Sequence, residues 1–276
     1  MTIVEDFFAK INQLPMLPKV VQEVSQLLED SEVDVKVLAS KIEHDQVLTA
    51  RVLSMSNAAY YGCARRIKSI EDAVAVIGFK SLNTLVIASG VTRTFVAIPN
   101  FDLRHFWKQS LVVASIARQI AKDTKCDAET AYIGGLMHSV GLLPINLVFP
   151  AAGAKLEEQN QSLCILDRLD LEENLLGINH SQVGEMLARH WNLPPEIQSL
   201  IRYYADPFNK KASKLAPVVY AAAYIAFYLQ CFQPASKIAD MFDVNVALVL
   251  GLQDKAELSE NIETYQGFIA EAEAYI

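Results

Sequence analysis

The stretch "DVKVLASKIEHD", residues 34–45, establishes the fold class of this chain. Its apolar side chains Val35, Leu38, Ala39 and Ile42 recur at positions i, i+3, i+4 and i+7, which places them on one face of an α-helix. Asp34 precedes the first of them and can accept a hydrogen bond from a free backbone N–H of the first turn. The stretch therefore predicts an amphipathic helix that is capped by an aspartate.

The same helical pattern continues through most of the sequence. Asp45, Ser69, Asp102 and Asp127 each precede an apolar periodic run and are expected to cap a helix. Strand signals are scarce, because the sequence contains neither an Asn-Gly hairpin turn nor a run of alternating β-branched residues. The predicted fold class is all-α. Further helices are expected over residues 151–160, 162–176, 181–191, 195–205 and 211–232.

The segment "VAIPNFD", residues 96–102, interrupts the helical pattern. It contains Pro99 and Asn100, and a new helix cap follows at Asp102. This combination is typical of a connection between two compact parts of a chain. We therefore expect two helical lobes, an N-terminal lobe of residues 1–98 and a second lobe of residues 99–276.

The composition is that of a globular protein and argues against several classes of function. Hydrophobic residues make up 52% of the 276 residues, and the net charge of −8 disfavours nucleic-acid binding, which usually requires a basic patch. The four cysteines form no C-x-x-C pair, which excludes the common metal-finger and redox motifs. The longest apolar run, residues 215–229, is shorter than the roughly 20 residues of a bilayer span. We expect a cytoplasmic protein without a membrane partner, with buried cysteines.

The stretch "GLMHSVG", residues 135–141, contains the candidate functional site. An Asp in place of Ser139 would produce His-Asp-x-Gly, the metal-binding core of the HD phosphohydrolases. Together with "LPMLPKVVQEVSQLL" (residues 14–28) and "LLGINHSQVGEMLARHWNLPPEIQSLIRYYADP" (residues 175–207), it resembles the HDOD family, bacterial output domains related to those enzymes. The resemblance runs from about Leu14 to Tyr228. It implies a two-domain helical architecture, with an HD-like second lobe, and a role in signal transduction without catalysis.

The resemblance also implies that most metal ligands of the HD phosphohydrolases have been lost. Ser139 offers a neutral hydroxyl where those enzymes have a carboxylate. His138 and His180 remain, but a catalytic metal site needs about three protein ligands and an open position. We therefore expect no metal, no cofactor and no catalytic residue. The other ligand positions fall on Gln109, Tyr204, Ala205, and Ala223 or, if the register shifts by one, Tyr224.

The residues of this site have a structural interpretation beside the functional one. His138 lies in an apolar segment, as a hydrogen-bonded core histidine does, and His180 can simply begin a helix. Glycines such as Gly141, which is expected to end a helix, permit close helix packing. In the functional interpretation, a vestigial pocket hydrogen-bonds a nucleotide or an anion. Its candidate residues are His138, Ser139, His180, Gln109 and Tyr204.

Three functions remain open at this point. The first is a non-catalytic signalling or scaffold protein that contacts other proteins of a bacterial signalling pathway. The second is a metal-dependent phosphohydrolase with atypical ligands, and the third is a small-ligand sensor that uses the vestigial pocket. The sequence favours the first, because the ligand set is lost while the apolar framework is kept. Whether the chain forms a homodimer stays open.

Overall fold

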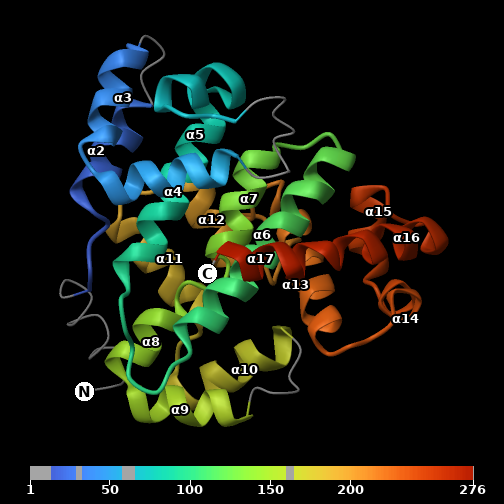
Figure 1. Ribbon diagram of the computed structural model, residues 1–276. Coiled ribbons are helices and arrows are strands. Elements are labelled where there is room, and N and C mark those ends of the chain that lie inside the picture. Colours follow the sequence, from blue (N-terminus) through green and yellow to red (C-terminus); the bar gives the residue numbers. More distant parts are fainter. Residues whose placement is uncertain (1–13, 29–32, 58–65, 160–164, 276) are drawn as a thin grey trace. The chain divides into compact units, whose positions relative to one another are not determined.

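A computed structural model of the chain shows an assembly of helices (Figure 1). It describes residues 14–28, 33–57, 66–159 and 165–275. Helices account for 74% of the chain, and no strand occurs among the described residues. The prediction of an all-α fold is confirmed.

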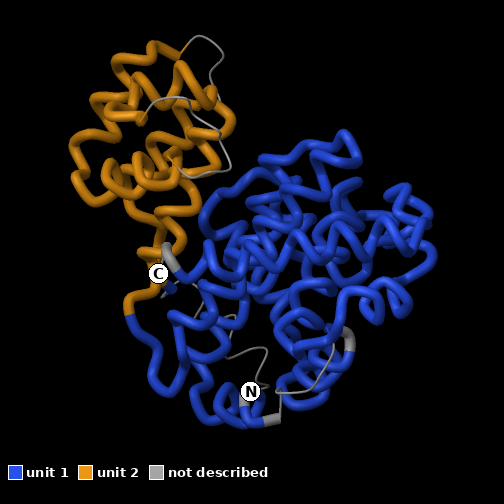
Figure 2. Tube along the Cα trace, turned by 45° about the vertical axis from the view of Figure 1, so that its right-hand side comes forward, with its two compact units in different colours: residues 1–14, 97–276 blue, residues 15–96 orange. Residues whose placement is uncertain are grey.

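The chain divides into two compact units, which Figure 2 colours separately. The small unit comprises residues 15–96, and the large unit comprises residues 1–14 and 97–276. The change from one unit to the other falls between Val96 and Ala97. This point lies inside the segment 96–102, two residues before the boundary that we placed after residue 98.

Four helices form the described part of the small unit. Helices α2, α3 and α4 pack on α5, which bends at Gly78, where φ is 77° and a side chain would strain the backbone. Asp34, Asp45 and Ser69 accept hydrogen bonds from the first turns of α3, α4 and α5, as the sequence predicts. The bounds are α2 (Lys19–Leu27), α3 (Val35–Glu43), α4 (Gln46–Ser56) and α5 (Ile70–Thr94).

The large unit is organised around one long helix, α6 (Leu103–Asp123), on which α7, α13 and α17 pack (Figure 1). Asp102 and Asp127 cap α6 and α7, as predicted. Helix α11 packs on α8 and α12, and α12 also contacts α7, so these helices surround the candidate site. The remaining bounds are α7 (Ala128–Met137), α8 (Leu142–Val148), α9 (Pro150–Gln159), α10 (Ile165–Leu176), α11 (His180–His190), α12 (Pro195–Tyr203), α13 (Ala216–Gln230), α14 (Ala235–Asp240), α15 (Val244–Leu250), α16 (Lys255–Tyr265) and α17 (Gly267–Tyr275).

The apolar run at residues 215–229 is the buried helix α13, as expected, although the helix starts later than predicted. It begins at Ala216 instead of residue 211. Pro217 lies in its first turn, where a backbone N–H would have no hydrogen-bond acceptor within the helix, so the missing N–H of proline costs no hydrogen bond. Two stretches have the length and apolar character of a membrane-crossing helix, Ile70–Thr94 and Ala128–Val148. Half of the apolar window of the first and 83% of the second are buried, and buried core helices share this composition.

The expectation of buried cysteines was wrong for the two that the structure describes. Cys126 is exposed and Cys231 is half-buried. Both lie at helix ends, where the chain turns through solvent: Cys126 follows the last turn of α6, and Cys231 is the cap of α13. Cys63 and Cys164 lie outside the described residues.

Candidate functional site

The start of α11 holds His180 in a fixed position. The side chain of Asn179 accepts a hydrogen bond from the backbone N–H of Gln182 at 3.1 Å, and the Gln182 side chain accepts one from the Asn179 N–H at 2.9 Å. This reciprocal pair is a capping box, which satisfies two N–H groups that a helix start otherwise leaves free. His180 is therefore the first residue of a well-anchored helix, and its side chain is buried.

A buried carboxylate on α10, that of Glu172, is hydrogen-bonded to His180. Glu172 Oε2 accepts hydrogen bonds from the backbone N–H of His180 at 2.7 Å and from its Nδ1 at 2.6 Å. Glu172 Oε1 accepts one from Arg168 Nε at 3.0 Å. Burial alone would raise the pKa of Glu172, but its interactions with His180 and Arg168 outweigh burial and lower it. The carboxylate is therefore ionised and satisfied on both oxygens.

The other nitrogen of His180 faces a phenol. Tyr204 Oη and His180 Nε2 lie 2.7 Å apart, and both side chains are buried. Burial raises the pKa of Tyr204 far above its usual range, so the phenol keeps its proton. His180 thus donates from Nδ1 to Glu172 and shares a second hydrogen bond with Tyr204 through Nε2. We call Arg168, Glu172, His180 and Tyr204 the polar network.

His138 contacts the same phenol ring from the end of α7. Its ring meets that of Tyr204 edge to face, with centroids 5.1 Å apart and planes at 82°. His138 Nδ1 donates to the carbonyl oxygen of Gly135 at 2.7 Å. Burial lowers the pKa of His138 to about 4, so its imidazole is neutral at pH 7. The two histidines thus meet through Tyr204, whose ring lies 5.9 Å from that of His180.

The turn between α7 and α8 lies directly on the start of α11. A Cβ on Gly141 would lie 2.0 Å from the carbonyl oxygen of His180 and 2.5 Å from the backbone nitrogen of Gly184. A Cβ on Gly135 would likewise lie 2.8 Å from the Cα of Ala114 in α6. These glycines serve close packing, as the structural interpretation held. The prediction that Gly141 ends a helix was wrong, because α7 ends at Met137 and Gly141 precedes α8.

The structure brings together only part of the predicted pocket. His138, His180 and Tyr204 form one cluster, and Ser139 is buried in the adjoining turn. The amide of Gln109, in contrast, contacts the ring of His105, one turn earlier on α6. That contact gives Gln109 a local partner on its own helix, and no bond joins it to the cluster among the described residues.

The remaining lost-ligand positions are occupied by residues of the apolar core. Ala205 and Ala223 are buried and offer no ligand atom. The ring of Tyr224 packs against those of Tyr228 and Phe242, at 4.7 and 5.5 Å between centroids. Neither possible register of the lost aspartate therefore supplies a carboxylate.

Sequence reasoning missed Arg168 and Glu172, the two charged members of the polar network. Their spacing of four residues within "DRLDLEEN" is a visible signal, since residues i and i+4 lie side by side on a helix. What the spacing alone does not reveal is that Glu172 is buried against His180.

The cluster does not fit a divalent cation. Within the described ranges, no group of three or more His, Cys, Asp or Glu side chains could hold a metal ion. The Nε2 atom of His180, through which the ring would bind a cation, is instead hydrogen-bonded to Tyr204 Oη. The metal centre of HD phosphohydrolases therefore has no counterpart in this part of the chain.

Comparisons with known proteins place this geometry in context. A family model described as the HDOD domain matches residues 14–207. A Shewanella amazonensis SB2B protein, provisionally named a phosphohydrolase, is 30% identical; the match covers 98% of this chain and 97% of that one, with a TM-score of 0.80. An HDOD domain protein with unknown function from Geobacter sulfurreducens is 25% identical, with 98% and 97% coverage and a TM-score of 0.75. These likenesses confirm the predicted fold, an HDOD architecture with an HD-related helical lobe.

One relative is much longer than this chain. An uncharacterized protein of Treponema pallidum (strain Nichols) is 27% identical over 197 residues, which is 71% of this chain. The same match spans only 38% of the Treponema protein. Similarity to that protein therefore concerns the shared domain alone.

Proposed function

This chain belongs to the HDOD family, and from that premise we propose that it is a non-catalytic signalling or scaffold protein acting through contacts with other proteins. Its partners would be proteins of a bacterial signalling pathway in the cytoplasm. Nucleic acid is a poor candidate partner, because the chain carries a net charge of −8.

The observation that carries this proposal is the hydrogen bond between Tyr204 and His180. In a metal site, a histidine commonly donates one ring N–H to a carboxylate and binds the metal with its other nitrogen. His180 keeps the first half of this arrangement, through Glu172, but gives its other nitrogen to the phenol. A neutral O–H group thus stands where a cation would bind, which supports a framework without metal chemistry.

The competing function is hydrolysis of a phosphate ester. The name of the Shewanella relative suggests it, and neutral His138 retains one ring nitrogen beyond its bond to Gly135. A metal-activated water needs several ligands around one ion, and the contacts of His138 are a hydrogen bond to the carbonyl oxygen of Gly135 and the ring of Tyr204. This environment favours the scaffold over the enzyme.

The proposal is tested by measuring metal content and turnover on the same preparations. Wild type and His138→Gln are purified without chelator, analysed by inductively coupled plasma mass spectrometry, and assayed on phosphodiester and nucleotide substrates with added Mn²⁺, Fe²⁺ or Zn²⁺. We expect less than stoichiometric metal and equal background rates for the two proteins. Metal-dependent turnover that His138→Gln abolishes would make the chain an enzyme.

Protein contacts require their own measurement. The tagged chain is used to capture proteins from its native host, with and without EDTA. We expect a reproducible partner whose capture is unaffected by the chelator and by His138→Gln. If no protein is enriched over a tag-only control, the scaffold function is wrong.

A further inference from the structure

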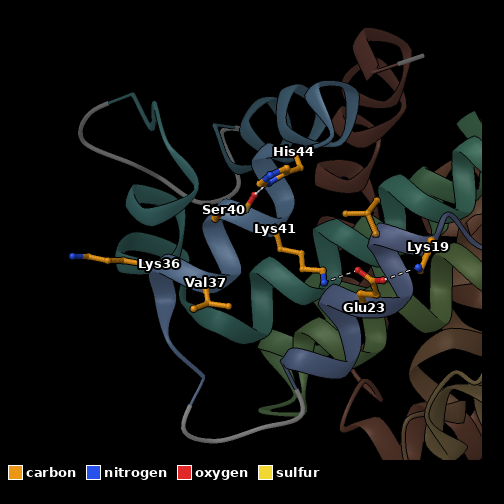
Figure 3. A pocket seen from close by; sticks show the side chains of 8 residues that line it. Lys19, Glu23, Lys36, Val37, Ser40, Lys41 and His44 are labelled. Atoms are coloured by element: carbon orange, nitrogen blue, oxygen red, sulfur yellow. Dashed lines mark hydrogen bonds and ion pairs between the residues drawn. The ribbon is translucent and has the colours of Figure 1, made fainter.

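A groove of about 760 Å³ runs between α2 and α3 on the small unit (Figure 3). Val20 and Val37 contribute apolar surface to it, and lysines lie around them. Val37 is 53% exposed although its helix neighbours Leu38 and Ile42 are fully buried. The Val37 side chain does not pack in the core of the small unit, so its apolar surface is available to a partner.

The lysines of the groove outnumber its carboxylates. Lys19, Lys36 and Lys41 line it, and Glu23 is the one acidic residue among the lining side chains. Glu23 pairs with Lys41 at 2.6 Å and with Lys19 at 3.5 Å, and the hydrogen bond from Lys41 is the main cause of its lowered pKa. Each ammonium has three N–H groups, so both paired lysines keep donors for a further carboxylate.

Lys36 lies apart from this cluster. In Figure 3 its side chain points away from Glu23, at the opposite end of the groove from Lys19. Positive charge therefore lies at both ends of an apolar floor, on a chain whose net charge is −8. Such a local surplus attracts an acidic partner and selects against a basic one.

The far flank of α3 is more acidic than the groove. A smaller hollow of about 340 Å³ there is lined by Glu43, Glu71 and Lys36. An acidic segment is repelled on that side and attracted on the α2 side. The charges flanking α3 thus favour an acidic occupant on the α2 side.

We infer that the groove between α2 and α3 binds an acidic amphipathic helix of a partner protein. Its apolar stripe would cover Val20 and Val37, and its glutamates or aspartates would meet Lys19, Lys36 and Lys41. Recognition of an amphipathic helix by a groove between two helices is a recurrent mode of protein binding. The inference rests on the proposed function, because it names the surface and the chemistry of the partner.

The test uses synthetic helical peptides of about 18 residues, long enough to populate helix in water. One peptide carries a leucine stripe flanked by glutamates, a second has the same composition in scrambled order, and a third has lysine in place of each glutamate. Binding to the full chain is measured by fluorescence anisotropy at about 0.05 M and 0.5 M salt. We expect the first peptide to bind at least about tenfold more tightly than the others, and more weakly at high salt.

Variants then locate the site. Lys36→Glu and Val37→Asp change exposed residues, so the fold should tolerate them, and each is expected to weaken the first peptide about fivefold or more. Lys237→Glu makes the same charge change at an exposed position on α14 of the large unit and serves as the matched control. Circular dichroism verifies that each variant keeps its helical content.

The inference is overturned if no peptide binds, if the acidic and lysine peptides bind equally, or if Lys36→Glu and Val37→Asp behave like Lys237→Glu. These outcomes are separable from failure of the proposed function. If the chain captures a partner from its host and the groove variants capture it equally well, the scaffold function stands and the groove is not its binding surface.

Discussion

Replacing Tyr204 with phenylalanine removes one oxygen atom from the centre of the polar network. The ring keeps its packing against His138 and His180, but Nε2 of His180 loses its hydrogen-bond partner in a buried environment. A buried donor or acceptor left without a partner costs about 1–3 kcal/mol. For a unit of roughly 200 residues, each kcal/mol lowers Tm by about 2–4 °C, so we expect Tyr204→Phe to lower Tm by roughly 2–12 °C.

The assay is thermal unfolding followed by circular dichroism at pH 7. Tyr203→Phe is the matched control, because it deletes the same atom from the neighbouring half-buried tyrosine and should change stability by no more than about 0.5 kcal/mol. If Tyr204→Phe unfolds at the same temperature as Tyr203→Phe, the hydroxyl does not hold His180, and the interpretation of the polar network is wrong.

Three further predictions concern the adjoining turn. Ser139→Asp should bind no metal in calorimetric titration and should destabilise the fold by about 1–3 kcal/mol, because a buried carboxylate gains no cation. The pKa of His138 falls to about 4 on folding, so its contribution to stability is complete above pH 6.5 and is lost as the pH decreases toward 4, by at most about 1.4 kcal/mol per pH unit. His138→Gln should therefore flatten the dependence of Tm on pH in this window. Gly141→Ala should destabilise by more than about 3 kcal/mol or prevent folding, because its Cβ would overlap the His180 carbonyl, whereas Gly267→Ala meets no atom within 4 Å and should be tolerated in the same melting experiment.

The helices were predictable because their signals are local. Apolar periodicity and capping residues act within one or two turns, and Asp34, Asp45 and Asp127 cap the helices that follow them. Errors arose where tertiary packing decides the outcome. The turn at residues 138–141 ends α7 early because Gly141 must approach α11, a contact that no local pattern encodes.

The candidate site was predictable in part for the same reason. The resemblance to the HDOD family identified His138, His180 and Tyr204, which the structure brings together. Gln109 was included because of its position in the family pattern, but its amide contacts His105 instead. Glu172 was missed, because a glutamate among other charged residues of a helix reads as exposed until its burial is known.

The polar network also limits how such a sequence can diverge. Glu172 balances the charge of Arg168, orients His180 and, through it, depends on the hydroxyl of Tyr204. A mutation at one position leaves a buried hydrogen-bonding group at another position without its partner, which destabilises the fold. Substitutions at these positions should therefore occur together. Among close homologues we expect positions 172, 180 and 204 to covary. In lineages that regain a metal ligand at position 204, we expect the other metal ligands to have returned with it.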